Sequence, residues 1–120
     1  MLAQEIIRHK RDGQVLDRAQ IDAFVAGLVD ASWSEAQAAR VMLAQIAADA
    51  RGATRVGFKA SGGIRTVADA AVYLALCEQA LGPQALQPAR FRIGASSLLN
   101  DIEAVLGGSS APLPSAPASY

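Results

Sequence analysis

The sequence predicts an α/β chain in which three helices precede a β-α-β-α unit and a flexible tail. Up to residue 50, apolar residues recur at helical spacing behind polar capping residues. After Gly52, two short runs with alternating apolar residues, 55–60 and 90–94, flank a longer helical pattern. From Gly107 the composition turns to Gly, Ser, Pro and Ala, which leaves little to bury, so residues 107–120 are expected to form the tail.

The first two helices are predicted from apolar spacing and capping residues. Residues 2–11 should form a helix that stops at Gly13, and residues 18–29 a second helix behind Asp17 as N-cap. We expect the basic side chains in the last turn of the first helix to be solvated: Arg8, Lys10 and Arg11. The apolar residues of the second helix have the spacing of a single stripe: Ile21, Phe24, Val25, Leu28 and Val29.

A third helix is predicted by a capping motif. Ser32 and Glu35 stand in the S-x-x-E spacing of a capping box, so the helix should open at Ser32. Its apolar residues carry it to about Ala50, and Gly52 should end it.

The β-α-β-α unit starts with a strand at residues 55–60, in which Lys59 faces away from the apolar side chains. Thr66 should cap the following helix, which Gly82 ends, and residues 84–89 should form a loop. After the second strand, Ser96 or Ser97 should cap a last helix that reaches about Leu106. Two strands joined by a helix are expected to pair in parallel.

Composition excludes several classes of function. The 11 lysine and arginine residues balance 11 aspartate and glutamate residues, so charge gives no argument for nucleic acid or an anionic membrane. Cys77 is the only cysteine, which fits a reducing compartment and predicts a core residue, and His9 is the only histidine, so no metal site is expected. Glu5 argues against a signal peptide, and no apolar run reaches the ~18 residues of a membrane span. We therefore expect a cytoplasmic chain.

The residues from Val56 to Thr66 are the candidate site. Lys59 stands near the end of the first strand, next to the Gly62-Gly63 turn and the start of a helix. Glycine lets a backbone approach a ligand closely, and helix N-termini favour anions, so this arrangement suits carbonyl or phosphate chemistry. A plain turn with an exposed lysine is the alternative.

Two blocks in this region resemble a known family. VGFKASGGIRTVADAAVYLAL is similar to the seventh strand and helix of deoxyribose-phosphate aldolase, and FRIGASSLLNDIEAVLG to its eighth. The resemblance covers about residues 40–106 and implies a β-α-β-α fragment of a TIM (β/α)8 barrel. This family of class I aldolases cleaves 2-deoxyribose 5-phosphate to glyceraldehyde 3-phosphate and acetaldehyde through a lysine Schiff base. It implies no cofactor.

The same resemblance implies roles for individual residues. Lys59 corresponds to the family's second lysine, which tunes the nucleophile, and Tyr120 to a terminal tyrosine that assists proton transfer. The phosphate-holding turns correspond to Gly62, Gly63, Ser96 and Ser97. The Schiff-base lysine lies on the sixth strand of that family, which has no counterpart here, so catalysis should be weak or absent.

The N-terminus resembles a second family. LAQEIIRHKRDG, the next helix and SWSEAQ are similar to the start of thymidine phosphorylase, whose first helices take part in dimer contacts. The likeness covers about residues 1–37, and none of that family's substrate-binding residues maps here. A fusion is implied, with a helical segment 1–39 joined near Gln37–Arg40 to an aldolase fragment, from two families that act in deoxynucleoside breakdown. The expected ligand is phosphate or a sugar phosphate. The alternative is a non-catalytic fusion fragment that forms homo-oligomers.

Overall fold

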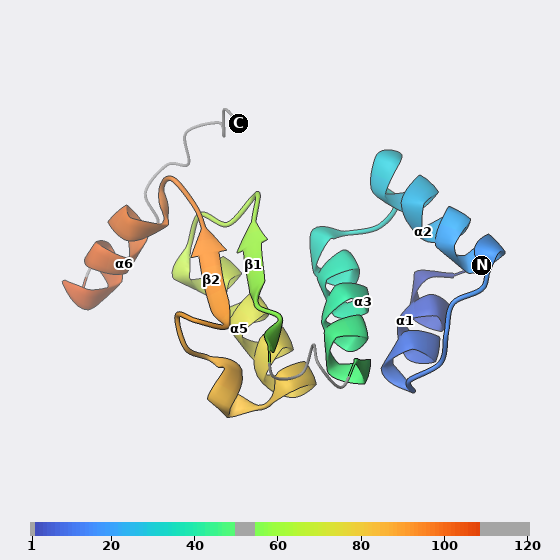
Figure 1. Ribbon diagram of the computed structural model, residues 1–120. Coiled ribbons are helices and arrows are strands. Elements are labelled where there is room, and N and C mark those ends of the chain that lie inside the picture. Colours follow the sequence, from blue (N-terminus) through green and yellow to red (C-terminus); the bar gives the residue numbers. More distant parts are fainter. Residues whose placement is uncertain (1, 50–54, 109–120) are drawn as a thin grey trace.

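The computed structural model describes residues 2–49 and 55–108 of the 120-residue chain and shows a helix-rich α/β arrangement (Figure 1). The N-terminal part is a bundle of α1 (Ala3–Arg11), α2 (Arg18–Val29) and α3 (Glu35–Ala48). It is followed by β1 (Phe58–Ser61), α5 (Val67–Leu81), a short 3-10 helix (Pro83–Ala85), β2 (Phe91–Gly94) and α6 (Leu98–Leu106). The predicted tail from residue 109 onward and the predicted helix stop at Gly52 lie outside the described residues.

Local capping sets the second helix where the sequence predicted it. The Asp17 carboxylate accepts a hydrogen bond from the Gln20 N–H at 2.8 Å, and the Gln20 amide oxygen accepts one from the Asp17 N–H at 2.9 Å. These reciprocal bonds satisfy N–H groups that a helix start leaves without partners. The predicted bounds of the second helix are confirmed, whereas α1 ends at Arg11 as predicted but begins at Ala3, with Leu2 as its N-cap.

The predicted start of the third helix is wrong by two residues. Ser34, and not Ser32, is the N-cap, and its hydroxyl oxygen accepts from the Gln37 N–H at 3.1 Å. Trp33 is buried against α2, and its N–H donates to the Gly27 carbonyl at 3.2 Å, so the chain enters the helix only after this residue. At the other end, α3 stops at Ala48.

One prediction about the exposure of helical side chains is wrong. Lys10 is 7% exposed, and its ammonium donates to the Gln14 carbonyl at 3.3 Å, whereas Arg8 and Arg11 are solvated as expected. Most of the predicted stripe on α2 is exposed, because this helix packs through Phe24 and Gly27 against Trp33. Four residues of the stripe stay exposed: Ile21, Val25, Leu28 and Val29.

The two strands pair in parallel, as predicted, with Phe58 opposite Phe91 and Ser61 opposite Gly94. Both strands begin later than predicted, because the ladder starts where the Phe58 N–H donates to the Arg90 carbonyl at 2.8 Å. Part of the predicted 84–89 loop belongs to the 3-10 helix. The capping box of α5 is confirmed, since the Thr66 hydroxyl accepts from the Asp69 N–H at 3.1 Å.

The core joins the helical bundle to the strands. In Figure 1, α3 lies between α1 and α2 on one side and β1 and α5 on the other. Leu43 of α3 and Leu76 of α5 are buried in one cluster, with Phe58 and Tyr73 packed against it. Cys77 is fully buried beside Phe91, which confirms that it is a core residue. Within the described residues, no helix has the length and apolar character needed to cross a membrane.

Candidate anion-binding site

The predicted site residues gather at one edge of the sheet. Because β1 and β2 are parallel and end in the pair Ser61–Gly94, the turns that follow them leave the same edge. Gly62 and Gly63 follow β1 directly, and Ser96 and Ser97 lie just before α6. Figure 1 shows both arrowheads pointing the same way, with both turns beyond them. The structure therefore brings the two predicted anion-holding turns to one edge.

Glycine is required at the first of these turns. Gly62 has φ +92° and Gly63 has φ +68°, a region of backbone space that side chains disfavour. Within residues 2–49 and 55–108, the N–H groups of Gly62 and Gly63 donate to no protein acceptor. Successive N–H groups in such a turn can form a concave site for an anion.

The N–H groups that lead into α5, from Arg65 to Val67, are already hydrogen-bonded to carboxylates. The Asp69 carboxylate accepts from the N–H groups of Arg65 at 3.1 Å and Thr66 at 3.2 Å. The Asp101 carboxylate, from α6, accepts from the Val67 N–H at 2.7 Å. The hydrogen bond from the Arg65 N–H is the main cause that holds the pKa of Asp69 below its ordinary value. An anion that binds at this edge can therefore accept hydrogen bonds from the N–H groups of the glycine turn, but not from those that lead into α5.

The second turn offers hydroxyl groups. Ser96 is exposed, and Ser97 is half-buried at the N-cap of α6. The Ser97 side chain makes no capping hydrogen bond, so its hydroxyl is available to a ligand. The first N–H groups of a helix have no partner within it, and those of α6 follow Ser97 directly in the chain.

Lys59 lies on the exposed face of β1 and reaches toward β2. Its Cε atom is 3.0 Å and its Nζ atom 3.6 Å from the position that a Cβ atom would take at Gly94. Because Gly94 has no side chain, the lysine can lie along the sheet toward the edge that carries both turns. Tyr120, the other predicted catalytic residue, lies outside the described residues.

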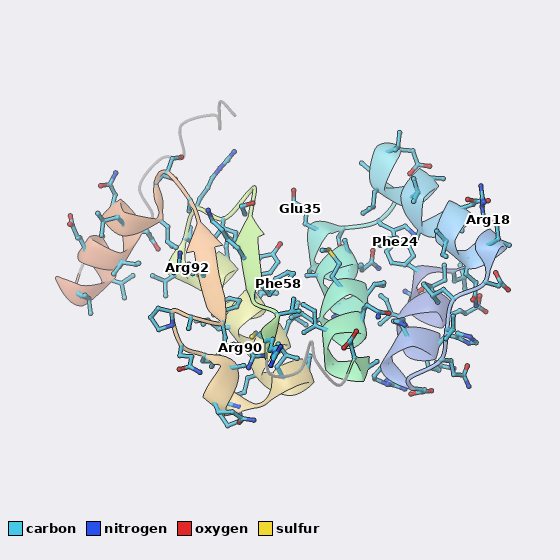
Figure 2. The ribbon with its side chains drawn as sticks, viewed as in Figure 1. Arg18, Phe24, Glu35, Phe58, Arg90 and Arg92 are labelled. Atoms are coloured by element: carbon cyan, nitrogen blue, oxygen red, sulfur yellow. The ribbon has the colours of Figure 1, made fainter. Side chains whose placement is uncertain are left out.

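Sequence reasoning missed Glu35 as a residue of this site. Its Oε2 atom lies 3.2 Å from the Cβ position at Gly63, and its Oε1 atom 3.4 Å from that at Gly62. Figure 2 shows Glu35 at the N-terminal end of α3, on the side that faces β1. Burial first, and then the Glu35 charge, raise the pKa of Tyr73. The sequence assigned Glu35 only to a helix cap, because its approach to the turn depends on how α3 packs.

Among the described residues, no group of three His, Cys, Asp or Glu side chains is placed to hold a metal ion. Burial raises the pKa of the Cys77 thiol, which makes the reactive thiolate less accessible.

The two parts of the chain are similar to different families. Residues 4–48 match the helical bundle domain of a glycosyl transferase family, and this range ends with α3. Over 54 residues, 45% of this chain, there is 50% identity to deoxyribose-phosphate aldolase of Agrobacterium fabrum. Over 49 residues, 41% of this chain, there is 55% identity to deoxyribose-phosphate aldolase of Mus musculus.

Both resemblances expected from the sequence are thereby confirmed, with the aldolase similarity in the C-terminal portion. The matched helical range extends beyond Gln37, where the likeness to thymidine phosphorylase was expected to fade. The chain spans 21% of the length of the first aldolase and 15% of the second. A search of the solved structures found no match.

Proposed function

We propose that β1, α5, β2 and α6 form the phosphate-holding corner of an aldolase (β/α)8 barrel, joined to a thymidine phosphorylase-like helical segment. On this proposal the chain binds phosphate or a sugar phosphate such as 2-deoxyribose 5-phosphate, with little or no aldol cleavage. On this proposal the join lies near Gln37–Arg40, within α3, and the helical family match extends past it to residue 48.

One observation carries the proposal of anion binding. The Gly62-Gly63 turn, with free N–H groups, leaves the same sheet edge as the Ser96-Ser97 turn, and Lys59 extends along that edge. Phosphate sites of (β/α)8 barrels are commonly built from two such turns and a helix N-terminus. The identity to aldolases over this portion supports the same assignment.

The proposal of weak catalysis rests on the lysine. In the aldolase family a Schiff-base lysine on another strand attacks the sugar, and Lys59 corresponds to the residue that tunes it. Cleavage by this chain would need Lys59 itself as the nucleophile and a nearby group to move protons. Within the described residues, no carboxylate is hydrogen-bonded or ion-paired to the Lys59 amine. Tyr120 is proposed as a proton-transfer residue of the complete family site only.

The test is a titration of the 15N-labelled chain with inorganic phosphate and then with 2-deoxyribose 5-phosphate. We expect amide shifts at Gly62, Gly63, Ser96 and Ser97, and no acetaldehyde release above background. The Gly63→Ala variant should lose the shifts. Gly13→Ala is the matched control, because Gly13 also has a positive φ, of 78°, but no atom lies within 4 Å of its Cβ position. Absent shifts at millimolar phosphate, or a borohydride-trapped adduct formed at an enzyme's rate, would refute the proposal.

A second candidate is a non-catalytic fragment that forms homo-oligomers. The apolar residues that α2 leaves exposed favour it, since Val25 is 51% and Val29 83% exposed, and a two-stranded sheet has open edges. A monomeric mass at every concentration tested by light scattering would rule this candidate out.

A further inference from the structure

A separate groove lies on the other side of Lys59, between the helical bundle and β1. It encloses about 610 Å³ and is bordered by the segment after α1, by α2, by α3 and by β1. Its walls are mainly aliphatic and aromatic, with Phe24, Val41, Met42, Ile46 and Phe58 among them. In Figure 2, Phe24 and Phe58 lie on opposite sides of α3, on α2 and β1 respectively. This volume falls within the range of about 300–1,000 Å³ that small-molecule sites occupy.

One cation is buried at this groove. Lys10 of α1 borders it, is only 7% exposed, and has one recorded hydrogen bond, to the Gln14 carbonyl at 3.3 Å. An ammonium group carries three donors, so two have no protein acceptor within the described residues. None of the residues that border the groove is acidic, and within the described part of the chain Lys10 forms no ion pair. A buried charge without a counterion is costly, so an anion that reaches Lys10 would gain free energy.

The side chains that line the groove also indicate the chemical character of the rest of the ligand. Met42 is 52% exposed and Val56 46% exposed, so the groove presents apolar side chains that an occupant would cover. A phosphate ester keeps most of its strong hydration and has little apolar surface to bury there. A monocarboxylate with an apolar body meets both requirements, because it places one charge on Lys10 and its hydrocarbon on the walls.

We propose that this groove binds an apolar monocarboxylic acid, with its carboxylate on the Lys10 ammonium and its hydrocarbon against Phe24, Met42 and Phe58. The proposal does not depend on phosphate binding at the glycine turn. Lys59 borders the groove, but its ammonium lies toward Gly94. The two sites therefore use different cations.

Octanoate, 1-octanol and octylammonium are suitable probes, since they share a chain and differ in charge. Each is titrated into the full 15N-labelled chain. We expect octanoate to shift amides of Val41, Met42 and Phe58, with 1-octanol about tenfold weaker and octylammonium without effect. Lys10→Met should reduce octanoate to the affinity of 1-octanol. Arg8→Met is the control, because Arg8 is an exposed cation on the same helix that does not border the groove.

A charge-inverting variant tests the site if Lys10→Met does not fold. Met42→Glu changes a half-exposed side chain in the groove, and it should abolish octanoate binding and permit octylammonium binding. The proposal is wrong if octanol matches octanoate in the unsubstituted chain, or if Lys10→Met leaves octanoate affinity unchanged. It is equally wrong if octanoate shifts only Gly62, Gly63 and Ser97, or if dilution alone reproduces the groove shifts, since a second copy would then be the occupant.

Discussion

Glu35 holds its carboxylate against Gly63, with Oε2 3.2 Å from the position a Cβ atom would take there. Glu35 belongs to the range that matches a glycosyl transferase helical bundle, whereas Gly63 lies in the β-α-β-α part. A carboxylate from one part of the chain thus lies beside the turn that we propose as the anion site of the other. A phosphate bound at this turn and the Glu35 carboxylate would repel each other, and between exposed charges this effect is about 1 kcal/mol or less.

Glu35→Gln should therefore strengthen phosphate binding by about threefold to fivefold, since 1.4 kcal/mol corresponds to about tenfold. The shifts of Gly62 and Gly63 in a phosphate titration measure this affinity. The gain should shrink at high salt, because exposed charges are screened. The control is Glu78→Gln, which removes the same charge near the far end of α5. An unchanged or lower affinity would show that Glu35 does not oppose the anion.

Local signals explain which helices the sequence predicted well. Asp17 and Gln20 form a cap that depends only on residues three apart, and the bounds of α2 follow from it. At the third helix two local signals overlap, since Ser32–Glu35 and Ser34–Gln37 both have capping-box spacing. The burial of Trp33 against Gly27 decides between them, and that contact is tertiary.

In the candidate site too, some features follow from the sequence and others only from tertiary packing. Parallel pairing of two strands joined by a helix brings Gly62 and Ser97 to one edge, and this was predictable from chain order. The positions of Glu35 and of buried Lys10 depend on how α3 packs between the strands and α1. No periodicity or motif carries that information, because these positions are set by contacts between segments that are far apart in the sequence.

The contact between Leu43 and Leu76 should make the two parts unfold together. Leu43 is 1% exposed and Leu76 is 7% exposed, and they share one cluster across α3 and α5. Leu43→Ala should lower the free energy of unfolding by about 2–4 kcal/mol through lost burial and a residual cavity. Urea unfolding followed by far-UV circular dichroism gives this value.

Met42→Ala is the control for this change. Met42 is next to Leu43 in the sequence, but its side chain is half exposed, so truncating it should lower the free energy of unfolding far less. Hydrogen exchange at amides of α1 and α5 tests the coupling directly. Amide hydrogens of both helices should exchange faster in Leu43→Ala than in the unsubstituted chain. Faster exchange in α1 alone, or two separate unfolding transitions, would mean that the parts fold independently.

Asp69 should make stability depend on pH in the acid range. Its pKa is held below the ordinary 3.8, chiefly by the hydrogen bond from the Arg65 N–H. A carboxyl group with a lowered folded-state pKa stabilises the fold above its unfolded pKa and loses that effect as pH falls through the folded value. Asp69→Asn should cost about 1 kcal/mol at neutral pH, as loss of a capping group does, and should flatten the acid decline.

Thermal unfolding from pH 6 to about pH 2 compares the two chains. Asp22→Asn serves as control, since the Asp22 carboxylate makes only an exposed ion pair with Arg18 at 3.0 Å. If the stability of the unsubstituted chain and of Asp69→Asn fell in parallel as the pH is lowered, the Asp69 carboxylate would not contribute to the pH dependence.

Gly27→Ala should destabilise the bundle even though alanine favours helices. In an exposed helix this change would stabilise by about 1 kcal/mol. Here a Cβ atom at Gly27 would overlap the Trp33 ring, so the ring must move and α2 must shift away from it. Overpacking of this kind costs about 1–3 kcal/mol. Fluorescence of Trp33, the only tryptophan, reports both the unfolding midpoint and the displaced ring. Adding Trp33→Leu to the same chain should remove most of the penalty, relative to Trp33→Leu alone. A stabilised single variant would mean that α2 and Trp33 are not in contact.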